Sequence, residues 1–124
     1  MSTFYVIATP IGNLGDITLR ALRILKEVDL VLCEDTRVTR KLFEKYQIPT
    51  QTMSYHAQSG EAKVEIILEK IEEGKNIALV TDAGTPGISD PGSMLISQIR
   101  EKFPELEITA IPGASALTTA LSIA

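Results

Sequence analysis

Several features are scarce in this 124-residue chain, and each absence excludes a class of protein. Cys33 is the one cysteine, so no disulfide can form within the chain, which is usual in a reducing compartment. Residues 1–10 lack the basic segment and the long apolar stretch of a signal peptide. No apolar run approaches the roughly 20 residues that span a bilayer. We therefore expect a cytoplasmic protein without membrane contact.

Common catalytic and metal-binding motifs are also missing. The chain has no Walker A loop and no Gly-x-Ser-x-Gly motif, so P-loop and serine-hydrolase functions lack support. No group of His, Cys and Asp residues has metal-ligand spacing, so we expect no metal. The net charge of −4 argues mildly against broad, non-specific binding of nucleic acid, although a local basic patch remains compatible with it.

The composition is that of one ordinary globular domain. Hydrophobic residues make up 44% of the chain and charged residues 23%, and a chain of this length can bury a core without disulfides.

Residues 114–124 are mostly small and apolar, and the sequence stops inside that pattern without a capping glycine or a polar tail. We therefore expect a fragment of a longer protein, cut before a second domain.

Short β-prone segments alternate with segments of helical period along the whole chain. Val64, Ile67, Leu68 and Ile71 have the i, i+3, i+4, i+7 spacing of a helix, and Gly74 follows as a C-cap. Such alternation predicts an α/β fold, with a five-stranded, mainly parallel sheet and helices on both faces. The expected strands are 4–9, 30–34, 51–55, 77–81 and 106–111, and the expected helices are 16–27, 36–46, 61–73, 93–103 and one from 114 onward.

The strongest functional signal is the segment Thr81–Gly92, which contains three glycines, two prolines and two aspartates. It follows the apolar run 77–80, and ligands bind at the carboxyl ends of strands in open α/β sheets. The segment is longer than most connections of its kind, which favours a ligand-binding loop over a structural turn. Asp82 could accept hydrogen bonds from a ribose or an amine, and Asp90 is suited to cap the next helix.

A second loop, Thr9–Asp16, follows the first expected strand, where dinucleotide-binding proteins hold a pyrophosphate. Only Gly12 and Gly15 of the usual glycine pattern are present, and Asp16 would repel a phosphate from the helix start. Dinucleotide binding is therefore poorly supported. The last expected loop, 111–116, contains Pro-Gly and enters the final helix, where Ser115 could cap that helix or donate to a ligand.

The segment Cys33–Arg37 allows two interpretations. Its acidic residues stand at a strand end, where a ribose-binding carboxylate occurs in nucleotide folds. Equally, Asp35 or Thr36 could cap the next helix, with Glu34 and Arg37 as a local ion pair. Cys33 itself ends an apolar run and is expected in the core.

The next helix carries a basic stripe, and the loop after the third strand carries a lone histidine. The stripe consists of Arg37, Arg40, Lys41 and Lys45. Most such stripes are solvated surface, and the alternative is a surface that contacts RNA phosphates. His56 is the only histidine and is expected on the surface, although an imidazole there could accept a proton near neutral pH.

These segments together resemble the N-terminal domain of the tetrapyrrole methylase superfamily. The matching runs are 9–14, 16–22, 33–37, 82–92 and 112–113. The run Asp82–Gly92 is nearest to the branch that methylates a cytidine ribose 2'-oxygen in 16S rRNA, because corrin and porphyrin methylases usually carry a shorter loop there.

The resemblance implies an S-adenosylmethionine-dependent methyltransferase that acts on 16S rRNA in the 30S subunit. It also implies a homodimer and a cofactor cleft between two α/β domains, of which residues 1–124 are the N-terminal one. By position, the resemblance assigns to the cofactor cleft Pro10, Gly12, Asn13, Asp82, Ala83, Gly84, Thr85, Pro86, Pro112, Gly113, Ser115 and Ala116.

Methyl transfer from a sulfonium to a ribose hydroxyl depends mainly on positioning, and a base or a cation should assist the poor nucleophile. The candidate catalytic residues are Glu34, Asp35 and Arg37, and the candidate RNA contacts are Arg37, Arg40, Lys41 and Lys45. Two alternatives stay open: a methyltransferase for a corrin or porphyrin precursor, and a nucleotide-binding module without catalysis.

Overall fold

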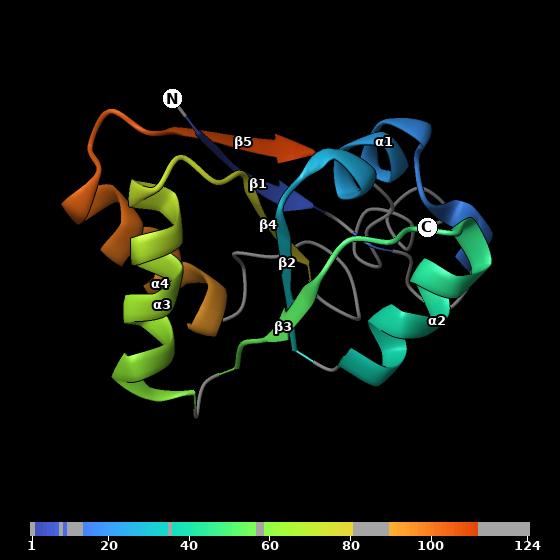
Figure 1. The fold of residues 1–124 in the computed structure, drawn as a ribbon, viewed down its shortest axis with the longest axis horizontal. Coiled ribbons are helices and arrows are strands. Elements are labelled where there is room, and N and C mark those ends of the chain that lie inside the picture. The colour runs from blue at the N-terminus through green and yellow to red at the C-terminus, as the bar shows by residue number, and fades with distance from the viewer. Residues whose placement is uncertain are drawn as a thin grey trace, which may run out of the picture.

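The computed structural model of the chain describes residues 2–7, 9, 14–34, 36–56, 59–80 and 90–111. At its centre lies a sheet of five strands in the order β3-β2-β4-β1-β5, and all neighbours run parallel (Figure 1). The strands are β1 (Thr3–Ile7), β2 (Leu30–Cys33), β3 (Thr52–Ser54), β4 (Ile77–Val80) and β5 (Glu107–Ile111). The predicted α/β fold with a five-stranded parallel sheet is confirmed.

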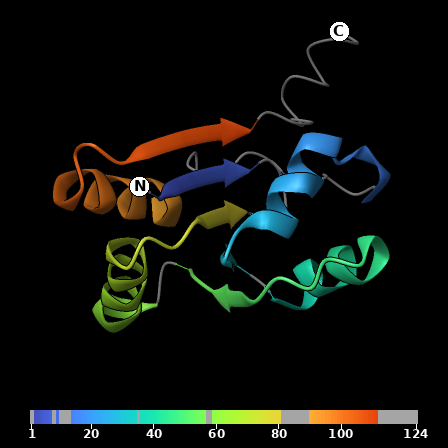
Figure 2. The ribbon, with the colours of Figure 1, turned by 45° about the horizontal axis from the view of Figure 1, so that its top comes forward.

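Helices cover both faces of this sheet. They are α1 (Leu19–Glu27), α2 (Thr36–Tyr46), α3 (Gly60–Glu72) and α4 (Asp90–Lys102), with the short 3-10 helix η1 (Leu14–Asp16) before α1. Figures 1 and 2 show α1 and α2 on one side of the sheet and α3 and α4 on the other. We call these the α1/α2 layer and the α3/α4 layer. Each helix crosses over between two parallel strands, the connection that parallel strands require.

Two apolar cores follow from the alternation of side chains along the strands. Phe4 packs among buried residues of the α3/α4 layer such as Ile67 and Leu95, whereas Ile7 packs among those of the α1/α2 layer such as Leu25. Every residue of β2 and of β4 is buried, as expected of strands with helices on both faces. The continuous apolar runs in the sequence are explained by this double cover.

Every predicted boundary that has an observed counterpart lies within three residues of it, and the largest differences are at the starts of α1 and α4. The first helix begins at Leu19 rather than Asp16, because the Thr18 side chain accepts a hydrogen bond from the Ala21 backbone N–H at 3.1 Å and caps the helix there. The helix predicted from Ser93 begins at Asp90 instead. The helix predicted from residue 114 lies outside the described residues.

Two single-residue predictions concern the core and a helix end, and both are confirmed. Cys33 is fully buried. Gly74 follows α3 with a φ of +89°, a left-handed conformation that glycine adopts without the clash of a Cβ. Its backbone N–H donates to the carbonyl oxygen of Ile71 at 3.0 Å, which satisfies one of the last carbonyls of the helix.

Candidate functional site

The carboxyl ends of all five strands lie along one edge of the sheet, because every strand runs in the same direction. Ile7 of β1 is in register with Val80 of β4 and with Ile111 of β5, and Cys33 of β2 is in register with Ser54 of β3. All the loops singled out in the sequence leave the sheet from this carboxyl edge. The expectation that they gather at one edge therefore agrees with the strand directions.

The strand order identifies the middle of the carboxyl edge. β4 lies between β1 and β2, so the end of β4, which the segment 81–89 follows in the chain, lies between the ends of β1 and β2. The connections after β1 and β2 pass to the α1/α2 layer, whereas the connection after β4 passes to the α3/α4 layer. Neighbouring strands whose connections leave in opposite directions open a crevice, and ligands of open α/β sheets bind at such a switch point.

Most of the predicted site residues lie outside the described residues. These are the twelve candidate cofactor residues and Asp35: Pro10, Gly12, Asn13, Asp35, Asp82, Ala83, Gly84, Thr85, Pro86, Pro112, Gly113, Ser115 and Ala116. Their places in the chain are still informative, because the three cofactor segments directly follow or begin just after β4, β1 and β5, which are consecutive in the sheet. The acidic segment follows β2, on the other side of β4.

The candidate catalytic residues that the structure describes lie at the β2 end of this edge. Glu34 follows Cys33 directly and is exposed. Arg37 lies in the first turn of α2 and is also exposed. Both side chains are therefore accessible from solvent at the carboxyl edge, as a role in contacting a large substrate requires.

The structure brings together a group of residues at the end of β3 that sequence reasoning did not assign to a site. The Lys63 ammonium, in the first turns of α3, donates to the Ser54 hydroxyl oxygen at 2.9 Å. The loop between them is held at Ser59, whose hydroxyl accepts from the His56 backbone N–H and whose own N–H donates to the His56 carbonyl, both at 2.9 Å. His56 is exposed, as predicted. No sequence motif links Lys63 to Ser54, so only the fold reveals this pair.

Tyr55 sits beside this group but faces the core. Its backbone N–H donates to the Cys33 carbonyl at 2.8 Å, which extends the pairing of β2 and β3 by one residue. Its side chain is 6% exposed and packs in the core of the α3/α4 layer. Burial raises the pKa of the Tyr55 phenol, because the charged form would lose its hydration.

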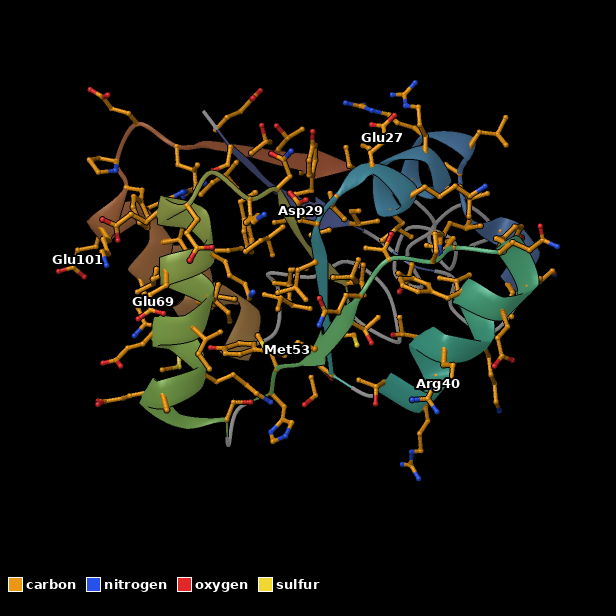
Figure 3. The ribbon with its side chains drawn as sticks, in the orientation of Figure 1. Glu27, Asp29, Arg40, Met53, Glu69 and Glu101 are labelled. Carbon is orange, nitrogen blue, oxygen red and sulfur yellow. The ribbon has the colours of Figure 1, made fainter. Side chains whose placement is uncertain are left out.

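Positive charge is concentrated on the α1/α2 layer. The predicted basic stripe is present on α2: Arg37, Arg40, Lys41 and Lys45 are all exposed. α1 has three basic residues against one acidic residue and α2 has four against one, whereas α3 has two against four and α4 has two against two. In Figure 3, Arg40 lies on the outer surface of α2, while Glu69 and Glu101 lie on the opposite layer. The overall negative charge thus conceals a basic face.

The described residues contain neither a metal-binding cluster nor a helix that could cross a membrane. No group of three or more His, Cys, Asp or Glu side chains there could hold a metal ion. Within the same residues, no helix combines the length and the apolar character that crossing a membrane needs.

A hollow of about 440 Å³ lies at the opposite, amino edge of the sheet and is lined mainly by apolar surface, including Ile71, Phe103 and Leu106. It is distant from the loops that carry the candidate residues.

Comparison with known sequences points to one family. The model of the family described as Tetrapyrrole (Corrin/Porphyrin) Methylases matches residues 3–124. The chain is 52% identical over 119 residues to ribosomal RNA small subunit methyltransferase I of Leptospira biflexa, covering 96% of this chain and 49% of that relative. It is 45% identical over 123 residues to the protein of the same name from Thermotoga maritima, covering 99% and 54%. The chain spans about half the length of these curated relatives.

Solved structures share the fold at low sequence identity. A putative cobalamin synthesis related protein from Corynebacterium diphtheriae matches with a TM-score of 0.76 at 18% identity, covering 99% of this chain and 58% of that one. A cobalt precorrin-4 methyltransferase matches with a TM-score of 0.70 at 22% identity, covering 98% and 49%. At these identities the likeness establishes the architecture alone, and the choice of substrate rests on other observations.

Proposed function

We propose, from the premise that this chain belongs to the tetrapyrrole (corrin/porphyrin) methylase family, that it is the N-terminal half of an S-adenosylmethionine-dependent methyltransferase. The methyl acceptor that we propose is a cytidine ribose 2'-oxygen of 16S rRNA in the small ribosomal subunit. The observation that carries this proposal is the 52% identity, over nearly the whole chain, to a relative named as a ribosomal RNA small subunit methyltransferase. We further propose that the whole protein is a homodimer with its cofactor cleft between two domains.

The arrangement of the strand ends fits a nucleoside cofactor. Val80, Ile7 and Ile111 end three consecutive parallel strands in register, so the loops after them start along a line of roughly 10 Å. Loops that start this close together can surround one small ligand from several sides. We propose that the segments 10–13, 82–86 and 112–116 hold S-adenosylmethionine there, with Asp82 as a hydrogen-bond acceptor.

Besides binding the cofactor, the proposed reaction requires the protein to position the ribose oxygen and to accept its proton. The bound sulfonium supplies an electrophilic methyl group, and the ribose oxygen must be held in line with it. The hydroxyl proton must also leave as the new bond forms, and a carboxylate near the oxygen is a suitable acceptor. The acidic segment Glu34–Asp35 follows β2, the neighbour of β4, and is therefore our candidate for that base. Arg37 is the candidate cation that balances the developing negative charge.

The charge distribution supports an RNA substrate. The exposed basic residues of α2 begin at the carboxyl edge with Arg37 and continue along the helix through Lys41 to Lys45. A nucleic-acid backbone binds through such rows of Lys and Arg, whereas a small macrocycle gains little from charges spread along a helix. We therefore propose that the α1/α2 layer faces the ribosomal RNA.

Methyl transfer by the full-length protein tests the proposal directly. The experiment supplies labelled S-adenosylmethionine and 30S subunits that lack the modification, and then maps the label by nuclease digestion. We expect label on one ribose 2'-oxygen of 16S rRNA. Measurable cofactor binding with label on a tetrapyrrole precursor instead would favour the corrin or porphyrin alternative. A protein that binds no cofactor at all would favour the module without catalysis.

A further inference from the structure

The corner formed by the end of β3 and the start of α3 carries a cation that a neighbouring hydroxyl group holds in place. The Lys63 ammonium has three donors, and one of them is directed to the Ser54 hydroxyl oxygen at 2.9 Å. Within the described residues, Lys63 forms no ion pair with a carboxylate. Its stem is half-buried, so the hydroxyl holds the charge in one place instead of leaving it to move freely in solvent.

The acidic residues nearest to Lys63 in the sequence of α3 do not pair with it. Glu61 and Glu65 each lie two positions from Lys63, and because residues two apart on a helix do not face each other, neither carboxylate forms an ion pair with the Lys63 ammonium. His56 is exposed, and two hydrogen bonds link it to Ser59, the residue before α3. α3 has four acidic residues against two basic ones, so Lys63 is one of only two cations on this helix.

The corner lies at the same edge as the proposed reaction. Ser54 is in register with Cys33, the residue before the candidate base segment, and β3 is separated from β4 by β2 alone. Two strand spacings amount to about 10 Å, a distance that a short stretch of RNA backbone covers. In Figure 1 the starts of α2 and α3 flank the ends of β2 and β3 from opposite sides. Arg37 and Lys63 therefore stand on opposite faces of the sheet at its β2–β3 end.

We propose that Lys63, held by Ser54, binds a backbone phosphate of the RNA substrate beside the reacting nucleotide. The RNA strand then crosses the β2–β3 end of the carboxyl edge, from the basic face of α2 to the start of α3. This inference rests on the proposed function, since it concerns how the same substrate is held. It adds a contact on the otherwise acidic layer, which the basic stripe of α2 does not predict.

The test compares Lys63→Met with Lys75→Met in the full-length protein, using 30S subunits as the probe. Lys75 is exposed at the amino edge, so its substitution removes the same charge far from the proposed RNA path. For Lys63→Met we expect KM for the subunits to rise roughly three- to tenfold. The negative slope of log affinity against log salt should become shallower by about one, because one phosphate contact is lost. Lys75→Met is expected to change neither quantity, and both variants should retain wild-type cofactor affinity.

Two further variants separate a phosphate contact from a merely structural one. Lys63→Arg keeps the positive charge, so we expect the slope of log affinity against log salt to stay at the wild-type value. Ser54→Ala also keeps the charge but removes the hydroxyl that holds the ammonium in place, so we expect KM to rise less than in Lys63→Met. Wild-type KM and salt slope in Lys63→Met would overturn this inference while leaving the proposed function intact. Failure of the wild-type protein to bind or methylate the subunits would instead overturn the proposed function itself.

Discussion

The two edges of the sheet differ in how their polar groups bear on the fold and on the candidate site. At the amino edge, the Asp29 N–H donates to the Asn76 carbonyl, and the Asn76 N–H donates back to Asp29 Oδ2, both at 2.8 Å. The Asn76 side-chain oxygen also accepts from the Thr3 N–H at 2.9 Å. Figure 3 shows Asp29 just before β2, where this network joins neighbouring strands. These hydrogen bonds join the starts of β1, β2 and β4, which is typical of a region that stabilises the fold.

The carboxyl edge presents its polar groups outward. Glu34, Arg37 and His56 are exposed there, and the long segment after β4 contains the glycines and prolines of the strongest sequence motif. Loops on a rigid parallel sheet are where binding and catalytic residues concentrate. We therefore expect substitutions at the amino edge to change mainly stability, and substitutions at the carboxyl edge to change mainly activity.

The largest effect is expected from the candidate base. In the full-length protein, Asp35→Asn or Glu34→Gln should lower kcat for methyl transfer by about 10²–10⁴, because a lost general base removes that much rate. Single-turnover kinetics with 30S subunits measure it. Asp29→Asn at the amino edge is the matched control and should keep kcat, since an amide oxygen can still accept from Asn76. Normal turnover in both carboxylate variants would remove this segment from the chemistry.

Charge reversal on α2 should give the next largest effect. Arg40→Glu combined with Lys41→Glu is expected to weaken binding of 30S subunits on the order of tenfold to 100-fold at low salt, because phosphate contacts become repulsive. A filter-binding titration at several salt concentrations measures this. Lys75→Glu with Arg100→Glu reverses two exposed charges at the other layer and should change little. Equal losses in both double variants would show only a general charge effect.

At the amino edge, Asn76→Ala should lower the free energy of unfolding by about 1–2 kcal/mol, because the Thr3 N–H loses its acceptor. Urea denaturation measures the change, and Asn76→Asp, which retains an acceptor oxygen, should recover part of it. Cofactor affinity is expected to stay at the wild-type value. A loss of cofactor binding at unchanged stability would contradict the division between the edges.

The smallest expected effect concerns Tyr55 and appears at alkaline pH. The unfolded phenol loses its proton near its ordinary pKa of 10.0, whereas burial raises the pKa in the folded protein. Above pH 10 the unfolded state therefore binds fewer protons, and stability falls as the pH rises. The free energy of unfolding of Tyr55→Phe should fall less steeply above pH 10 than that of the wild type, and the two values should match near pH 7. Parallel curves for the two proteins, from urea titrations at each pH, would refute this.

The fold class was predictable because it depends on local patterns. The bounds predicted for α2 are those observed, since its apolar positions, its polar start and the following proline all indicate the same helix. The start of α1 was missed because a capping bond from Thr18 decides it, and several nearby residues had similar capping ability. The cofactor residues came from family resemblance and stay predictions, as does the role of Asp35.

The sequence by itself determined the alternation of strands and helices, the burial of Cys33 and the basic character of α2, because periodicity and composition act over neighbouring residues. Only the tertiary structure decided that β4 lies between β1 and β2, since the same alternation is compatible with many strand orders and packing across the sheet selects one. It also decided that Lys63 meets Ser54, because the connection between β3 and α3 brings these two side chains, nine residues apart, within hydrogen-bonding distance. The order of the strand ends at the site thus depends on long-range packing that no local pattern encodes.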